Sequence, residues 1–292
     1  MLPELVTEIP GPQSRELAER LRRSECRNTT FVNEGWPVFW ERAEGVNVWD
    51  ADDNRFLDLT SAFAVAGLGH GRPELVRALT QQAESLLHGM GDVHPSRVKV
   101  ELCEKLGEIT FARWGAGPGK AILASSGFES VETALKTAVV ATGRAGIVAF
   151  EGGYHGLGYG ALLGTGLEKF RTPLAGQLAG VTHRLPFPRT GTGDDWQRAW
   201  EDLPGEEIGA VLVEPIQGRG GEIIPPSDFL PFLREWCDCH GALLIFDEIY
   251  TGFHRTGKLF ACERDEVVPD LVCLGKALSG GFPISACVGK AE

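Results

Sequence analysis

An acidic pair ends one of the apolar runs of this sequence. The stretch "ALLIFDEIYTGFHRTG" places Asp247 and Glu248 directly after the apolar residues. A carboxylate that leaves a buried strand is costly to desolvate unless it meets a positive charge or hydrogen-bond donors. Lys276 stands in a similar place, in "LGKALSGGFP", after another apolar run and before a glycine-rich turn. Burial lowers the pKa of a lysine side chain, and the free amine can attack a carbonyl to form an imine.

Two further segments are suited to a flat, anionic ligand. In "ASSGFESVE" a strand would lead through Ser126 and Gly127 into a helix, whose first N–H groups would point at an anion. A plain helix N-cap by Ser125 or Ser126 explains the same residues. In "EGGYHGLGYG" the ring of Tyr154 could stack on an aromatic ligand, and the glycines permit close approach.

Pyridoxal phosphate matches this set of groups. Its phosphate would lie at the helix start, Tyr154 would cover its ring, and Lys276 would bind its aldehyde. Asp247 would keep the pyridine nitrogen protonated, so that the ring can accept electrons. A phosphate loop is poorly supported, because "WGAGPGKA" has Trp114 and Ala121 where glycine and a hydroxyl residue are needed. No G-x-G-x-x-G motif opens a helix after the first strand, which argues against a nucleotide-dependent oxidoreductase.

The elements around these residues alternate between strand and helix patterns. The sequence predicts helices within 14–23, 73–88, 125–141 and 229–239, a β-hairpin around Asp50–Asn54, and strands at 121–124, 147–150, 209–215, 242–246 and 270–275. Short apolar strands between helices indicate an α/β fold with a mostly parallel central sheet that is covered on both faces.

In such a sheet, ligands bind at the carboxyl ends of the strands. The polar groups that follow the strands should therefore converge: Ser125, Ser126, Gly127, Tyr154, His155, Glu214, Asp247, Glu248 and Lys276. Within 73–88, one helical face is apolar and consists of Leu75, Val76, Leu79, Ala83, Leu86 and Leu87.

Composition excludes several classes of protein. The chain has 292 residues, 43% of them hydrophobic, which is enough for a substantial core, and its formal net charge of −12 argues against coating a nucleic acid. No apolar run reaches the roughly 18–20 residues of a membrane span, and the N-terminus lacks the pattern of a secretory signal. Seven scattered cysteines are typical of reduced thiols in a cytoplasmic protein. We predict no metal site, because the group Cys237–His240 has no second ligand pair at zinc-like spacing.

The segment "LLIFDEIYTGFHRTGKLFACE…VPDLVCLGKALSGGFPISACVG" resembles the cofactor region of class III pyridoxal-phosphate aminotransferases. The likeness extends upstream through "VEPIQGRGG", "FEGGYHG", "SSGFESVETALK" and "GVNVWDADDNRFLDLTSAFAVAGLGH", and it covers roughly 36–292. The resemblance implies a fold type I transferase with an N-terminal segment at 1–70, which is part of a small domain, and a large cofactor-binding domain at 71–292. It also implies that the C-terminal part of the small domain is absent from this chain.

The resemblance assigns roles to particular residues. Lys276 matches the lysine that binds the cofactor and moves the proton, and Asp247 matches the partner of the pyridine nitrogen. The other matched cofactor-binding positions are Ser126, Gly127, Phe128, Tyr154, His155, Glu214, Ile249 and Tyr250. This chain departs from the family pattern at Phe128, where Ser or Thr is usual, at Tyr250, which replaces a common glutamine, and at Asp53, which replaces a turn glycine.

The implied activity is transamination. An ω-amino donor of the 4-aminobutyrate, ornithine or acetylornithine type would give its amino group to a 2-oxo acid, with 2-oxoglutarate as the expected acceptor. Family active sites lie between subunits, so the resemblance also implies a homodimer. The alternatives are an aminomutase or decarboxylating transaminase of the same fold, and an inactive remnant that only binds cofactor or dimerises.

Overall fold

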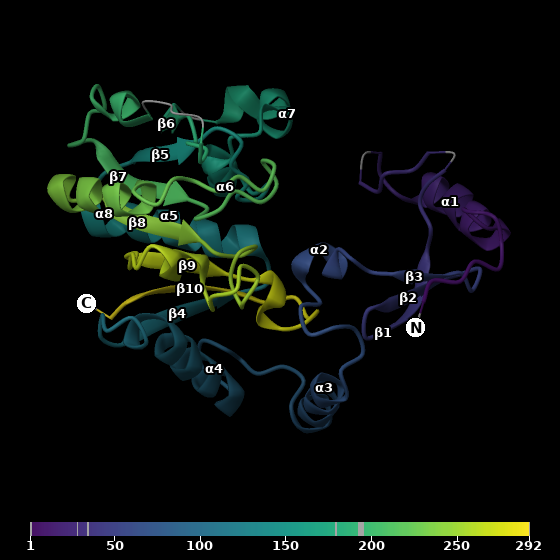
Figure 1. Cartoon of the computed structure of the whole chain (residues 1–292). Helices are drawn as coiled ribbons and strands as arrows, with labels where there is room; N and C mark the ends of the chain where they lie inside the picture. Colours follow the sequence, from purple (N-terminus) through teal and green to yellow (C-terminus); the bar gives the residue numbers. More distant parts are fainter. Residues whose placement is uncertain (1, 28, 34, 179, 192–195, 292) are drawn as a thin grey trace. The chain divides into compact units, whose positions relative to one another are not determined.

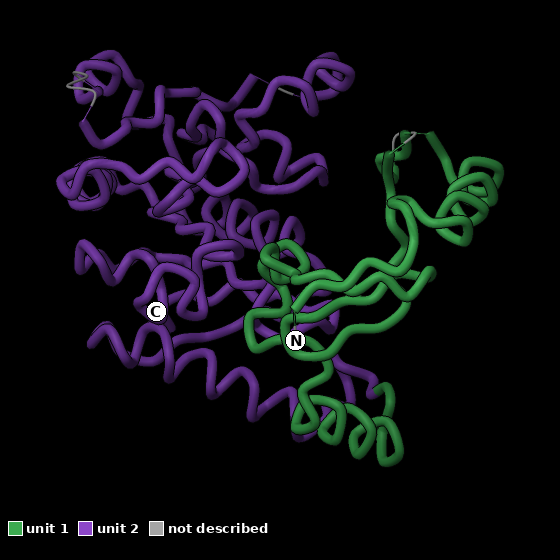
Figure 2. Tube along the Cα trace, turned by 45° about the vertical axis from the view of Figure 1, so that its right-hand side comes forward, with its two compact units in different colours: residues 1–88 green, residues 89–292 purple. Residues whose placement is uncertain are grey.

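The chain forms two compact units. The computed structural model describes residues 2–27, 29–33, 35–178, 180–191 and 196–291. The units are Met1–His88 and Gly89–Glu292, shown in green and purple in Figure 2. The division expected from the sequence, 1–70 and 71–292, stays a proposal; the first unit of the structure also contains the helix at residues 73–85. No helix within the described ranges is long and apolar enough to cross a membrane.

A three-stranded antiparallel sheet forms the centre of the first unit. Its strands are β1 (Trp40–Glu44), β2 (Asn47–Asp50) and β3 (Arg55–Leu57). The turn between β2 and β3 is closed by the carboxylate of Asp50, whose Oδ1 accepts the N–H groups of Asp52 at 3.0 Å and Asn54 at 2.8 Å. Asp53 has a φ of 62°, a left-handed conformation that aspartate tolerates better than most residues. The predicted hairpin is thereby confirmed.

The helices of the first unit are α1 (Pro12–Ser24), α2 (Ser61–Ala64) and α3 (Pro73–Ser85). Proline begins both α1 and α3, where its fixed φ and missing N–H cost nothing. The apolar face predicted for α3 is not buried in the chain: no residue of the helix is buried, and Leu87 just beyond it is 83% exposed.

The second unit alternates strands and helices (Figure 1). Its strands are β4 (Gly119–Ala124), β5 (Gly146–Phe150), β6 (Thr182–Leu185), β7 (Ile208–Val213), β8 (Leu243–Asp247), β9 (Leu271–Leu274) and β10 (Ser285–Lys290). Its α-helices are α4 (Arg97–Gly107), α5 (Gly127–Thr142), α6 (Tyr159–Gly164), α7 (Glu168–Arg171) and α8 (Phe229–His240). Short π or 3₁₀ turns are η1 (Glu108–Ala112), η2 (Thr172–Gln177), η3 (Trp196–Trp200), η4 (Ala261–Arg264) and η5 (Lys276–Leu278).

One sheet carries all of these strands in the order β4-β10-β9-β8-β7-β5-β6. Neighbours from β9 to β6 are parallel, and β10 runs antiparallel between β9 and β4. The predicted α/β class with a mostly parallel sheet is confirmed. Strands β6 and β10 were not predicted: "THRL" is too polar to look like a core strand, and "SACVGK" is too weakly apolar to distinguish from a loop.

The sheet is covered on both faces because its strands are apolar at successive positions. Val148, Phe246 and Val272 point to the face that packs on α8, whereas Leu212 and Ile245 point to the opposite face, which packs on α5. This alternation follows from the two-residue period of a strand. Burial on both faces makes the sheet a rigid base for the loops at the carboxyl ends of its strands.

Candidate functional site

The start of α5 provides backbone donors at the carboxyl end of β4. Ser126 is the N-cap residue, but its side chain makes no capping bond; its hydroxyl donates instead to Glu129 Oε2 at 2.7 Å. A plain side-chain N-cap, one of the two interpretations of this segment, is therefore not what the structure has. The N–H groups of Gly127 and Phe128 have no intrahelical acceptor, which leaves them suited to an anion.

Phe128 is accommodated by the glycines of the loop after β5. A Cβ on Gly156 would lie 2.3 Å from Phe128 Cβ, and one on Gly158 would lie 2.4 Å from the ring atom Cδ2. Gly156 also has a φ of 114°, which disfavours any side chain. The bulky residue that departs from the family pattern thus fits because this loop is built from glycine.

Asp247 ends β8 as a buried, hydrogen-bonded carboxylate. It is 4% exposed; its Oδ2 accepts a hydrogen bond from His155 Nδ1 at 2.8 Å, and its Oδ1 accepts the N–H of Ile249 at 3.1 Å. Burial alone would lower the pKa of His155, but the hydrogen bond and charge of Asp247 together with the charge of Glu214 raise it above 6.5. The hydrogen bond and charge of Asp247 thus favour the protonated form of His155.

Glu214 joins two loops at the carboxyl end of β7. Its Oε1 accepts the N–H of Tyr154 at 2.9 Å, and its Oε2 accepts the N–H of Gly218 at 3.0 Å. The side chain is buried, and burial raises the pKa of its carboxyl group, with the charge of Asp247 adding to the effect. Glu214 thereby fixes the backbone on either side of the site.

Lys276 lies in the same electrostatic environment as the two acids. Burial lowers the pKa of its amine from 10.5, while the charges of Asp247 and Glu214 act in the opposite direction. The residue begins η5 with a φ of 38°, a strained conformation for a side chain of this size. Its Nζ is 5.2 Å from the ring centroid of Tyr250. A lysine with a lowered pKa next to carboxylates is a feature typical of reactive sites.

Ile249 and Tyr250 lie next to Lys276 and pack against glycines. A Cβ on Gly127 would lie 3.0 Å from Ile249 Cδ1, and one on Gly275 would lie 3.2 Å from Ile249 Cγ2. The isoleucine therefore fills the space between the start of α5 and the residue before Lys276. Tyr250 packs its ring against Gly218, where a Cβ would be 2.6 Å from Cδ1.

Glu248 does not join this group, contrary to the expected convergence. It is fully buried, and its carboxylate accepts hydrogen bonds from the Thr251 hydroxyl and from the N–H groups of Ala261 at 3.0 Å and Cys262 at 2.8 Å. Adjacent residues at the end of a strand point to opposite sides of the sheet, so only Asp247 is directed to the site. Glu248 instead anchors the loop of residues 249–262.

Two residues of the site were not predicted from the sequence. Gln217 is 1% exposed; its Nε2 donates to Glu151 O at 2.7 Å, and its buried Oε1 has no partner among the described residues. Arg219 places its guanidinium carbon 4.5 Å from the ring centroid of Tyr154. Both belong to "VEPIQGRGG". Their position in a loop that follows a predicted strand is the feature of the sequence that could have indicated them as site residues.

This arrangement fits pyridoxal phosphate. Free backbone donors at α5 suit the phosphate, and the buried Asp247 carboxylate suits a protonated ring nitrogen. The Tyr154 ring suits the flat face of the cofactor, and Lys276 suits its aldehyde. Glycine at position 127 lets the start of α5 pack closely on Ile249, because a Cβ there would lie 3.0 Å from Ile249 Cδ1.

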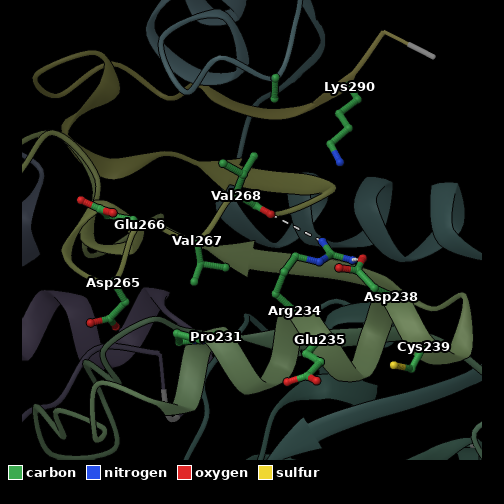
Figure 3. Close-up of a pocket in the computed structure, with 11 residues that line it drawn as sticks. Pro231, Arg234, Glu235, Asp238, Cys239, Asp265, Glu266, Val267, Val268 and Lys290 are labelled. Atoms are coloured by element: carbon green, nitrogen blue, oxygen red, sulfur yellow. Dashed lines mark hydrogen bonds and ion pairs between the residues drawn. The ribbon is translucent and has the colours of Figure 1, made fainter.

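A separate cavity lies at the other edge of the sheet. It has a volume of about 730 Å³ and is lined by residues of α8, by residues 265–268 and by Lys290 (Figure 3). Arg234 is neutralised there by Asp238 and Asp270, each 2.8 Å from a guanidinium nitrogen. None of the predicted site residues lines this cavity, and both of its cations, Arg234 and Lys290, are paired with aspartates of the protein.

Comparison with known sequences gives the family. The family model described as "Aminotransferase class-III" matches residues 31–292. The chain is 37% identical to a 4-aminobutyrate aminotransferase of Mycobacterium leprae, covering 99% of this chain and 67% of that protein. It is 40% identical to an acetylornithine aminotransferase of Methanopyrus kandleri, covering 88% of this chain and 63% of that protein.

Solved structures agree with this result. A transaminase from the marine bacterium Virgibacillus matches with a TM-score of 0.86 at 27% identity, over 94% of this chain and 65% of that one. The taurine:2-oxoglutarate aminotransferase of Bifidobacterium kashiwanohense, solved with pyridoxal phosphate and glutamate, also gives a TM-score of 0.86 at 27% identity, over 99% of this chain and 66% of that one. These neighbours confirm the fold type I architecture.

The fold, the acid–lysine site and these matches define one class of protein. The chain belongs to the class III aminotransferase family. It spans about two thirds of the length of the relatives that it matches.

Proposed function

We propose that this chain binds pyridoxal phosphate through Lys276 and catalyses transamination. The observation that carries the proposal is the convergence of Lys276 with Asp247 and Glu214: both carboxylates act on the lysine amine, and burial lowers its pKa. A covalent cofactor site needs an unprotonated amine close to an acid that can hold the ring nitrogen. Membership of the family supports the same conclusion.

Each side chain would have a defined part in the reaction. When bound, pyridoxal phosphate supplies an aldehyde that links to amines and a ring that withdraws electrons from the bond being broken. The amine of Lys276 would bind that aldehyde and then act as the base that moves the proton on the amine-bearing carbon of the substrate. Asp247, oriented by His155, would hold the proton on the ring nitrogen.

The remaining predicted residues would position the cofactor. The N–H groups at Gly127 and Phe128, next to Ser126, would bind its phosphate, and Tyr154 and Ile249 would enclose the two faces of its ring. Glu214 would hold the Tyr154 loop in place. Tyr250 would lie beside the lysine, because its ring centroid is 5.2 Å from Nζ.

The proposed substrates are an ω-amino donor and a 2-oxo acid acceptor. Relatives named for 4-aminobutyrate, acetylornithine and 5-aminovalerate support a donor whose amine is remote from a carboxylate. We propose 2-oxoglutarate as the acceptor. We further propose that the protein is a cytoplasmic homodimer, because family active sites lie between subunits.

Covalent labelling tests the cofactor site. The full chain is incubated with pyridoxal phosphate, reduced with borohydride and digested, and the labelled peptide is identified by mass spectrometry. We expect the label on Lys276 and its loss in Lys276→Ala, whereas Lys258→Ala, which removes an exposed lysine, keeps it. Labelling spread evenly over surface lysines would contradict the proposal.

A donor panel tests the reaction. 4-Aminobutyrate, ornithine and N-acetylornithine are each supplied with 2-oxoglutarate, and glutamate formation is measured by mass spectrometry. Glutamate from at least one donor, absent in Lys276→Ala, is the expected result. Carbon dioxide release or amine migration without glutamate would favour a decarboxylating enzyme or an aminomutase, and labelled but inert protein would favour an inactive remnant.

A further inference from the structure

Arg219 lies beside the candidate site and has no ion-pair partner among the residues that the structure describes. Its guanidinium carbon is 4.5 Å from the ring centroid of Tyr154 and 5.0 Å from that of Phe170, and the residue is exposed. The two rings are themselves in contact, with centroids 5.6 Å apart. Contact with aromatic faces holds a guanidinium in place while leaving its N–H edge free.

The loop that carries Arg219 is fixed close to Lys276. Gly218 donates its N–H to Glu214 and lies against the ring of Tyr250, and the amine of Lys276 is 5.2 Å from the centroid of the same ring. The charge of Arg219 also contributes, after burial, to the lowered pKa of Lys276. Two sets of contacts therefore hold Arg219 at the site: those of the neighbouring Gly218 with Glu214 and Tyr250, and those of its own guanidinium with Tyr154 and Phe170.

No acid in the described part of the chain forms an ion pair with Arg219. In this respect it differs from Arg113 and Arg234 of the same unit. Arg113 has Glu263 at 2.9 Å, and Arg234 has two aspartates at 2.8 Å. Lys169, 5.0 Å from the centroid of the Phe170 ring, adds a second cation to the same aromatic pair. The aromatic pair Tyr154 and Phe170 thus carries two cations that have no ion-pair partner among the described residues.

We propose that Arg219 is a specificity-determining residue that binds the carboxylate of the substrate, so that the site accepts amines and oxo acids bearing a carboxylate over uncharged analogues. This inference rests on the proposed function. A guanidinium presents parallel N–H donors that match the two oxygens of a carboxylate, and such charge-assisted bonds are stronger than neutral ones. The bound carboxylate would lie away from the carbon that reacts near Lys276.

Direct binding of a non-reacting dicarboxylate tests the proposal. The full chain, loaded with pyridoxal phosphate, is titrated calorimetrically with glutarate and, separately, with the uncharged glutaramide. We expect Arg219→Gln to weaken glutarate binding by at least about tenfold, from the loss of hydrogen bonds to a charged group, and to leave glutaramide unchanged. Arg219→Lys, which keeps the charge but not the fork of donors, should give an intermediate affinity.

Arg198→Gln is the matched control, because it removes an exposed arginine of the same unit from η3. It should bind glutarate like the parent chain. Glutarate that binds parent and Arg219→Gln equally, or that fails to bind the parent, would overturn the assignment of Arg219. Borohydride labelling of Lys276 in each variant separates this result from failure of the cofactor site, because a variant that still carries the label still binds pyridoxal phosphate.

Discussion

At the scale of single residues, the site depends on buried charges that compensate one another. Asp247 is paired with His155, and both act with Glu214 in a region almost closed to water. A buried carboxylate is stable only when hydrogen-bonded or paired with a cation. This pairing explains how an acid can end an apolar strand.

The raised pKa of His155 predicts a pH-dependent contribution to stability. Above pH 6.5 the folded state binds more protons at His155 than the unfolded state does. The stabilisation is therefore complete below pH 6.5 and is lost as the pH rises through the pKa that His155 has in the folded state. His155→Asn keeps a neutral donor near Asp247. The difference in free energy of unfolding between the parent and this variant, measured in urea between pH 6 and pH 9, should decline with rising pH. A difference that is constant with pH would contradict this prediction.

Gly156 supplies a second prediction for a single residue. Its φ is 114°, and an alanine Cβ would lie only 2.3 Å from Phe128 Cβ, so the loop leaves no space for alanine. Gly156→Ala should therefore lower the free energy of unfolding by about 1–3 kcal/mol, the range for a strained backbone. Gly176→Ala, where a Cβ meets nothing within 4 Å, is the control and should leave the urea midpoint unchanged.

At the scale of elements, the site is a set of loops anchored to the carboxyl edge of one sheet. Glu214 links the loops after β5 and β7, and Glu248 links the loop after β8 to η4. Each anchor is a buried carboxylate that accepts backbone N–H groups. Such loops hold their side chains more rigidly than free surface loops, which favours a preorganised site.

Glu248→Gln should lower the free energy of unfolding by about 1–3 kcal/mol, because the amide NH₂ would face donors with no acceptor. Burial raises the pKa of Glu248, so removing its charge acts in the stabilising direction. The loss of hydrogen bonds outweighs this effect, and the free energy of unfolding falls, because Thr251, Ala261 and Cys262 donate to both carboxylate oxygens. Urea unfolding at pH 7 is the measurement, with exposed Glu235→Gln as control. Equal midpoints for Glu248→Gln and the parent would show that the anchor is unimportant.

At the scale of the whole molecule, apolar side chains without cover suggest self-association. Val76, Leu79, Leu87, Val93 and Val100 are each at least 48% exposed. Isolated apolar residues are normal on a surface, but a contiguous exposed apolar patch is typical of an interface, and Val76 and Leu79 lie one turn apart on α3. The proposed homodimer would give these residues a partner surface.

Leu87→Glu should therefore shift the protein towards the monomer, because a charge replaces an apolar side chain that is 83% exposed. Sedimentation velocity over a range of concentrations gives the molecular mass. Val140→Glu changes an equally exposed apolar residue on α5 and should leave the mass of the assembly unchanged. A parent chain that sediments as a monomer at all concentrations would contradict the homodimer.

Much of the fold was predictable because its signals are local. The hairpin at Asp50–Asn54, the helices α5 and α8, and strands β5, β7, β8 and β9 follow from periodicity and turn residues. Strand β10 could not be predicted, since "SACVGK" becomes a strand only by inserting between β4 and β9. The exposure of α3 also could not be predicted, because its amphipathic pattern is the same whether or not a partner covers it.

The sequence by itself determined the chemistry: Lys276, Asp247 and the start of α5 follow strands of a parallel sheet, and strand ends of such a sheet meet at one edge. Tertiary structure alone decided which of two adjacent acids faces the candidate site, since side-chain direction depends on how the strand packs. It also decided that His155 is the ionic partner of Asp247 and that Arg219 has no ion-pair partner among the described residues, because these relations join residues far apart in the chain.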